Sequence, residues 1–124
     1  MADSSRVVAL VDDLMFVSRI TEAAAPQGLE VKKVRTVAEL VEACRPWPRV
    51  VLVDLDSSRL PWAEGVAALR ADPELAGVPV VGFYGHVHTE HGRLGEQAGC
   101  TRVLARGAFV QQLGRILELP AAPG

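Results

Sequence analysis

Short valine-rich runs alternate along this chain with segments of helical spacing, and this alternation is the feature that most restricts its fold. Runs of this kind are typical of strands that are covered on both faces in a parallel sheet. Between them, apolar residues recur at the three- to four-residue interval of an amphipathic helix. A regular exchange of the two patterns predicts a parallel sheet with helices packed on both of its faces.

Five strands and five helices are predicted, and their approximate limits follow from the patterns. The strands are expected at Arg6–Val11, Leu29–Val34, Val50–Leu55, Val78–Phe83 and Arg102–Leu104. The helices are expected at Leu14–Ala25, from a capping box at Thr36 to about Cys44, at Ala63–Ala71, at His88–Ala98 and at Phe109–Leu119. A single domain over residues 1–124 is expected, with its core at about 6–119 and a flexible tail at 120–124.

The expected fold class is α/β, a doubly wound sandwich with five parallel strands. Right-handed crossovers and short connections favour the flavodoxin-like strand order 2-1-3-4-5. In that order the first and third strands are neighbours at the topological switch point. Their carboxyl ends open into the crevice in which such folds bind ligands.

Composition excludes several classes of protein. The net charge of −2 gives no electrostatic reason to expect nucleic-acid binding. No apolar run approaches the roughly 20 residues that a membrane span requires. The opening MADSSR lacks the pattern of a signal peptide, and Cys44 and Cys100 form no metal motif. Their expected positions are too far apart for a disulfide, so we expect two packed thiols in the cytoplasm.

Three carboxylates are expected to meet in the crevice. Asp12 and Asp13 follow the first strand, and Asp54 ends the third. Like charges gathered there repel one another unless a cation neutralises them, and Mg²⁺ suits carboxylate oxygens with phosphate beside it. A neighbouring carboxylate can then act as the nucleophile and form an aspartyl phosphate. Asp54 is the best candidate for this nucleophile because it lies centrally at a strand end.

Four sequence blocks together resemble the receiver domain of bacterial response regulators, the CheY-like fold. They are LVDDLMFVSRI (10–20), VLVDLD (51–56), PVVGFYG (79–85) and AGCTRVLARGAF (98–109). The resemblance covers about Arg6 to Leu119. It implies that Asp54 is the phosphoacceptor and that a histidine kinase supplies the phosphoryl group. It also implies that Mg²⁺ is held by Asp12, Asp13, Asp54 and the backbone carbonyl of Asp56.

The chain departs from this family at the residues that read the signal. Tyr84 stands where members usually carry Thr or Ser, and Arg106-Gly107 stands where a Lys-Pro pair is usual. Val103 replaces the aromatic switch residue, and SSRLP (57–61) replaces the usual Met-Pro. These changes favour a divergent receiver. It is either phosphorylated and read differently, or it is a pseudo-receiver, an interaction module that works without phosphorylation.

In this family the face formed by the fourth helix, fifth strand and fifth helix contacts target proteins or a second copy. The candidate residues on this face are Leu94, Val103, Phe109, Val110, Leu113 and Leu117, most of which are also needed for the core. An enzyme is not predicted. No Gly-rich phosphate loop follows the first strand, and no Ser-His-Asp or Cys-His set stands at suitable positions.

Simpler interpretations stand beside these. Asp54 can be a solvated strand end, Asp13 can cap the first helix, and Arg106 can be a surface arginine. His88 and His91 lie one helical turn apart and can share zinc or nickel with His86 or Glu90 nearby. Alternatively, these histidines are solvated side chains at the edge of the domain.

Overall fold

The computed structural model describes residues 5–45 and 47–118, in which five strands alternate with five α-helices. The strands are β1 (Arg6–Leu10), β2 (Glu30–Lys33), β3 (Val50–Asp54), β4 (Val80–Tyr84) and β5 (Arg102–Ala105). The helices are α1 (Leu14–Ala24), α2 (Val37–Ala43), α3 (Trp62–Ala71), α4 (Thr89–Ala98) and α5 (Arg106–Leu117), with a 3₁₀ turn η1 (Ala25–Gln27) after α1. The expected tail at 120–124 lies outside the described residues.

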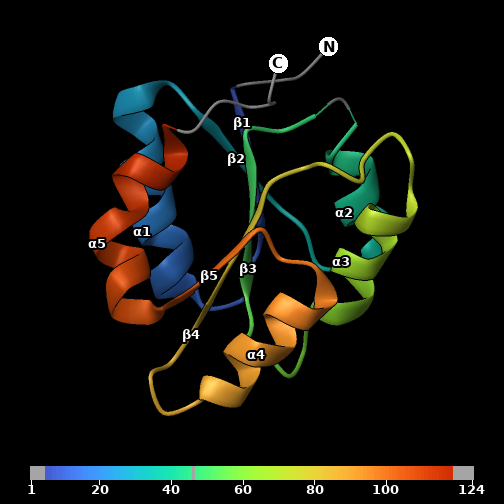
Figure 1. Cartoon of the computed structure of the whole chain (residues 1–124). Helices are drawn as coiled ribbons and strands as arrows, with labels where there is room; N and C mark the ends of the chain where they lie inside the picture. Colours follow the sequence, from blue (N-terminus) through green and yellow to red (C-terminus); the bar gives the residue numbers. More distant parts are fainter. Residues whose placement is uncertain (1–4, 46, 119–124) are drawn as a thin grey trace.

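The five strands form one parallel sheet in the order β2-β1-β3-β4-β5, which confirms the predicted fold class. Leu10 pairs with Val53, so β1 and β3 reach the same edge together. On the other side of β3, Asp54 pairs with Phe83. This order therefore brings the segments after β1, β3 and β4 side by side (Figure 1).

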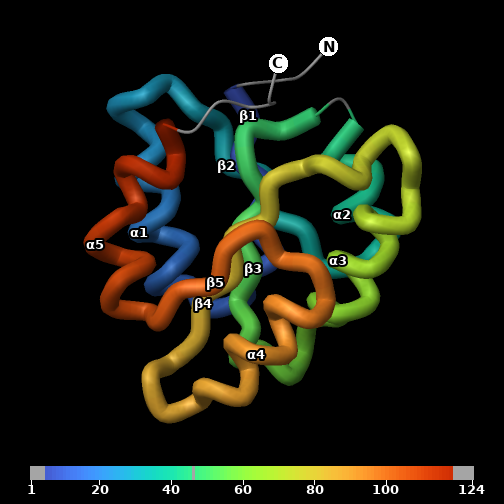
Figure 2. The backbone as a smooth tube through the Cα atoms, in the orientation of Figure 1, coloured from blue at the N-terminus to red at the C-terminus, as the bar shows by residue number. Residues whose placement is uncertain are grey.

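Helices cover both faces of the sheet, with α1 and α5 on one side and α2, α3 and α4 on the other (Figure 2). Every residue of β3 is buried, because its alternating side chains enter two separate cores. Val50 and Leu52 pack on the α1–α5 side, and Val51 and Val53 pack on the opposite side. Across residues 5–45 and 47–118, no helix combines the length and apolar content that a membrane crossing demands.

Two helices have the N-cap residues that the sequence predicts. Asp13 caps α1, its Oδ1 accepting hydrogen bonds from the backbone N–H groups of Met15 and Phe16 at 2.9 and 3.3 Å. Thr36 caps α2, its hydroxyl accepting from the N–H of Glu39 at 3.0 Å. Such caps satisfy backbone donors that would otherwise have no partner.

Helix α5 begins earlier than its apolar spacing predicts. The pattern places the start at Phe109, whereas the structure continues from β5 directly into helix at Arg106. Ala105 is the last extended residue, and the next one already has helical geometry. Arg106 therefore stands one turn before the fully buried Phe109, on the helix side that faces the sheet. It is not a loop residue.

Both cysteines are free, as expected. Cys44 is fully buried, and burial raises the pKa of its thiol to about 12. Burial likewise raises the pKa of Cys100 to about 11. Neither thiol is therefore activated as a nucleophile or metal ligand at neutral pH.

Leu55 fills a narrow space between the sheet and α4. A Cβ atom at Gly82 of β4 would lie 2.9 Å from Leu55 Cδ1, and one at Gly95 of α4 would lie 2.6 Å from the same atom. Leu55 is itself only 2% exposed and has little room to move. The two glycines therefore allow α4 to pack closely on β4.

We expect Gly95→Ala to lower the free energy of unfolding by about 1–3 kcal/mol relative to Gly114→Ala, because the added methyl group collides with Leu55. A Cβ added at Gly114 in α5 would meet no atom within 4 Å, so this alanine variant isolates the gain in helix propensity of about 1 kcal/mol. Urea unfolding of both variants measures the difference. Equal stabilities would show that Leu55 moves aside freely.

Candidate functional site

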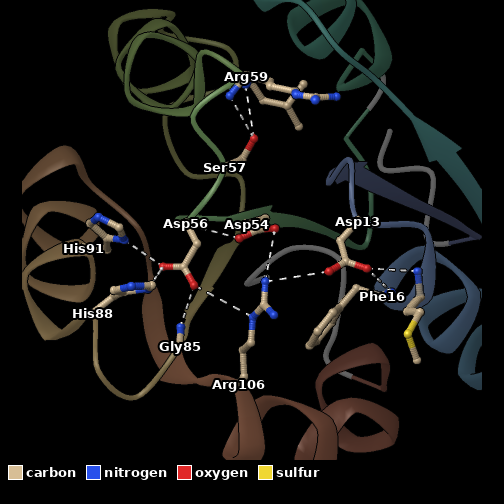
Figure 3. A network of polar contacts seen from close by, with 12 residues as sticks. Asp13, Phe16, Asp54, Asp56, Ser57, Arg59, Gly85, His88, His91 and Arg106 are labelled. Atoms are coloured by element: carbon tan, nitrogen blue, oxygen red, sulfur yellow. Dashed lines mark hydrogen bonds and ion pairs between the residues drawn. The ribbon is translucent and has the colours of Figure 1, made fainter.

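The acidic residues expected to meet are brought to one edge of the sheet. Asp12 and Asp13 follow β1, and Asp54 is the last residue of β3. The pairing of Leu10 with Val53 aligns the two strand ends. Figure 3 shows Asp13, Asp54 and Asp56 grouped around the side chain of Arg106. We call these four residues, with Asp12, the acidic site.

Asp54 is 3% exposed and is the one buried polar residue among those the structure describes. Its Oδ1 accepts a hydrogen bond from the N–H of Asp56 at 2.9 Å, and its Oδ2 lies 3.6 Å from Arg106 Nη2. Burial raises the pKa of Asp54. The N–H of Asp56 and the charge of Arg106 lower it, and the charges of Asp56 and Asp12 raise it further, with a net upward shift. A solvated strand end is therefore the wrong interpretation of this carboxylate.

Arg106 is the cation of the acidic site. Its Nη2 lies 3.6 Å from Asp54 and 3.9 Å from Asp13 Oδ2, and its Nε lies 3.9 Å from Asp56 Oδ2. The guanidinium stacks on the ring of Phe16, with 4.6 Å between Cζ and the ring centroid. An aromatic face attracts a cation in this position. Arg106 is therefore not a simple surface arginine.

One donor of Arg106 lacks a hydrogen bond. Among the described residues, Arg106 Nε is the one buried side-chain nitrogen or oxygen atom that has no hydrogen-bond partner. A buried N–H without an acceptor is unfavourable by about 1–3 kcal/mol. The guanidinium thus offsets part of the negative charge of the carboxylates at ion-pair distance, while no described residue accepts a hydrogen bond from its Nε.

Asp13 both caps a helix and faces the site. Oδ1 accepts the two backbone N–H groups at the start of α1, and Oδ2 points toward Arg106. Asp12 is half-buried, and its charge contributes to the raised pKa of Asp54. With Asp54 they supply carboxylate oxygens, the ligand type that Mg²⁺ prefers. The donor set therefore fits this ion.

The side chain of Asp56 has its own set of contacts. Oδ2 accepts a hydrogen bond from the N–H of Gly85 at 2.7 Å. Oδ1 lies 2.7 Å from Nδ1 of His91 and 3.3 Å from Nδ1 of His88. Burial raises the pKa of this carboxyl, but the hydrogen bonds from His91, Gly85 and His88 outweigh burial and hold the pKa below its usual value.

The sequence interpretation missed this role for the Asp56 side chain. The signal lies in the register between β3 and β4, which the strand order alone does not supply. Because Asp54 pairs with Phe83, continuing the register by two residues places Asp56 beside Gly85, at the start of the histidine segment. His86, which the sequence offers as a partner of His88 and His91, is exposed and is not part of this cluster.

The divergent readout positions lie on the α4 side. Tyr84 ends β4, and its ring packs so closely on α4 that a Cβ at Gly92 would lie 2.6 Å from Cε1. Val103 of β5 packs against the core beside Gly95. The Tyr84 ring is thus held by α4.

Most candidates on the α4–β5–α5 face belong to the core, as the sequence suggested. Phe109, Leu113 and Leu117 are buried, whereas Leu94 is 41% exposed. The more exposed apolar side chains lie elsewhere, at Val87 and at Leu14 and Met15, the last two of which begin α1 next to the acidic site.

We expect Asp54→Asn to be more stable than the unmodified chain at neutral pH in the presence of a chelator. Asparagine can keep the hydrogen bond from Asp56 but removes a carboxylate whose pKa folding raises. A raised acid pKa destabilises the fold above that pKa, and the penalty disappears when the group is protonated in both states. Urea unfolding from about pH 7 to about pH 4 should show the advantage of the variant shrinking as the pH falls. A difference in the free energy of unfolding that grows as the pH falls would contradict the raised pKa of Asp54.

The chain resembles known proteins in its structure. No family profile and no curated protein sequence matches the chain. The response regulator CheY4 of Vibrio cholerae is similar at a TM-score of 0.73 and 20% identity, over 92% of this chain and 96% of CheY4. The phosphorylated cyanobacterial phytochrome response regulator RcpA gives 0.71 and 22%, over 92% and 89%.

A third similar structure is the Mn²⁺-bound form of the response regulator Rcp1, with a TM-score of 0.72 and 14% identity over 97% of this chain and 99% of Rcp1. The resemblance in fold extends over nearly the whole length of all three proteins. The chain therefore has the CheY-like receiver fold of response regulators, at identities that mark it as a divergent example of that fold.

Proposed function

We propose that the chain is a receiver-type signalling protein of a two-component phosphorelay that accepts a phosphoryl group on Asp54 with Mg²⁺. The observation that carries this proposal is the arrangement of Asp54 Oδ2, which faces the Arg106 guanidinium at 3.6 Å at the sheet edge where Asp12 and Asp13 also lie. A nucleophile, a cation for the transferred group and carboxylates for a metal are thus close together.

In the proposed reaction, an oxygen of the ionised Asp54 carboxylate attacks the phosphorus of a phosphohistidine or a small acyl phosphate. A new P–O bond forms, and the bond from phosphorus to the leaving group breaks with its electron pair on that group. The buried position of Asp54 limits access of water, which favours a mixed anhydride that survives long enough to signal.

Asp12, Asp13, Asp54 and the backbone carbonyl of Asp56 would hold Mg²⁺. When bound, Mg²⁺ neutralises charge that develops on the phosphoryl oxygens. The similarly folded Rcp1 has a Mn²⁺-bound form, which supports the proposal that this fold can hold a divalent ion. Arg106 would take the place of the family lysine, and its Nε, buried without a hydrogen-bond partner among the described residues, would donate to a phosphoryl oxygen.

The conformational response to phosphorylation would follow a different route from that in typical receivers. Tyr84 is packed on α4, and Val103 has no ring to rotate, so the Arg106 end of α5 is the element that senses a new charge directly. We propose contacts with a histidine kinase next to exposed Leu14 and Met15. A target protein or a second copy would bind the α4–β5–α5 face, in the cytoplasm, and without nucleic acid or membrane.

A second function, the pseudo-receiver, is favoured by one observation. Arg106 lies at ion-pair distance from Asp13, Asp54 and Asp56 and offsets part of their negative charge. A chain with its own cation in the acidic site can keep one conformation and bind its partner without phosphorylation. The two functions differ in whether Asp54 reacts.

Incubation with acetyl phosphate and Mg²⁺ should add the mass of one HPO₃ group, measured on the intact protein. Asp54→Asn and chelator controls should show no adduct, because they remove the nucleophile and the metal. An adduct that persists in Asp54→Asn would place the reaction at another residue. Absence of any adduct in the unmodified chain, with no Mg²⁺ binding by titration, would leave the pseudo-receiver.

Arg106→Gln should tighten Mg²⁺ binding in the absence of phosphodonor, because the tethered cation no longer competes for Asp13 and Asp54. Loss of about 1 kcal/mol of partly exposed ion pairing corresponds to about fivefold in affinity. Arg115→Gln is the matched control, since Arg115 is exposed near the end of α5. Equal Mg²⁺ affinities in both variants would show that Arg106 does not compete with the ion.

A further inference from the structure

A second group of metal-ligating side chains shares Asp56 with the acidic site. We propose that Asp56, His88 and His91 form a site for Zn²⁺ or a chemically similar transition-metal ion. One ligand atom from each of the three lies within 4.8 Å of the others. Figure 3 shows both imidazole rings directed at the carboxylate of Asp56. Metal binding by these three residues does not depend on phosphorylation of Asp54.

The type of donor selects the metal. Two imidazole nitrogens and one carboxylate oxygen are a common set for zinc with an open coordination position. Mg²⁺ prefers an all-oxygen octahedron and is disfavoured by nitrogen ligands. The carboxylates of Asp12, Asp13 and Asp54 offer oxygen alone. The two neighbouring sites therefore differ in the metal each selects.

The distances from the two histidines to Asp56 are near those around a tetrahedral ion, and all three ligand atoms lie within 4.8 Å of one another. Zinc–nitrogen bonds of about 2.0–2.1 Å place neighbouring ligand atoms about 3.3 Å apart. The 3.3 Å between His88 Nδ1 and Asp56 Oδ1 already has this value. The 2.7 Å between His91 Nδ1 and Asp56 Oδ1 would have to widen by a small rotation of a side chain. A ring nitrogen binds a metal in its deprotonated form, so the ion would replace the contacts that Nδ1 of both rings makes with Asp56.

The backbone prepares the ligands for this arrangement. The N–H of Gly85 holds Oδ2 of Asp56 at 2.7 Å and leaves Oδ1 to face the histidines. A Cβ at Gly85 would lie 3.2 Å from Oδ2 and 3.5 Å from His88 Nδ1, so the absence of a side chain lets the turn approach both ligands. The backbone N–H of His88 donates a hydrogen bond to the Gly85 carbonyl at 2.7 Å, which holds His88 in the same turn.

The site is open to solvent on one side. The side chains of His88 and His91 are 49% and 38% exposed, whereas that of Asp56 is 14% exposed. An ion can therefore enter, and water or a partner's side chain can occupy a fourth position. The charge of Arg106 lies near the other oxygen, Oδ2, at 3.9 Å. The competing explanation is a pair of histidine hydrogen bonds to Asp56 without any metal function.

Titration of the metal-free chain with Zn²⁺, followed by calorimetry, should show one bound ion, and excess Mg²⁺ should not compete. We expect His88→Ala and His91→Ala each to weaken zinc affinity by at least about tenfold, the lower limit for loss of even an outer-shell partner. Co²⁺ absorption should report nitrogen ligation in the unmodified chain and lose that signature in both variants. Asp56→Asn should behave in the same way.

Two controls make the assignment specific. His86→Ala removes a histidine from the same segment but not from the cluster, so it should bind Zn²⁺ like the unmodified chain. Asp54→Asn removes the proposed phosphoacceptor and should also keep zinc binding, which separates this site from the acidic site. The proposal is overturned if no stoichiometric zinc binds to the unmodified chain. It is equally overturned if His88→Ala and His91→Ala, folded as judged by their thermal unfolding, bind as tightly as His86→Ala.

Discussion

A carboxylate at the end of a fully buried central strand needs a compensating charge, and much of the acidic site is arranged around that need. The two hydrophobic cores on either side of β3 shield Asp54 from solvent. The N–H of Asp56 and the guanidinium of Arg106 partly offset the loss of hydration. Phe16 supports the guanidinium through its ring face. The start of α1, the end of β3 and the start of α5 are thereby joined through one charged group.

Three consecutive residues at the end of β3 have different roles because their side chains point in alternate directions. Asp54 faces Arg106, Leu55 enters the core between Gly82 and Gly95, and Asp56 returns to the polar edge. The turn that directly follows β3 thus serves both packing and chemistry. Each of the two carboxylates meets a different set of partners because Leu55 anchors the backbone between them.

The strand order and the grouping of Asp12, Asp13 and Asp54 could be predicted because they depend on periodicity and on the rule that parallel strands share an edge. The resemblance also implied Arg106 as a possible substitute for the family lysine. Its place at the start of α5 could not be predicted, since the helical pattern becomes visible only at Phe109. The partners of Asp56 depend on the register between β3 and β4, which a strand order alone does not supply. Tyr84 shows the same limit, because its packing on α4 depends on Gly92.

Arg106 belongs to the chain, and this has a consequence for how the acidic site meets its surroundings. A dissolved ion can be diluted, but a tethered side chain keeps a constant local concentration near its carboxylates. Any incoming ion must therefore displace an occupant rather than fill an empty place. Competition with a tethered cation lowers the apparent affinity of the incoming ion by a constant factor, and the length of one arginine side chain, fixed at the first turn of α5, helps to set that factor.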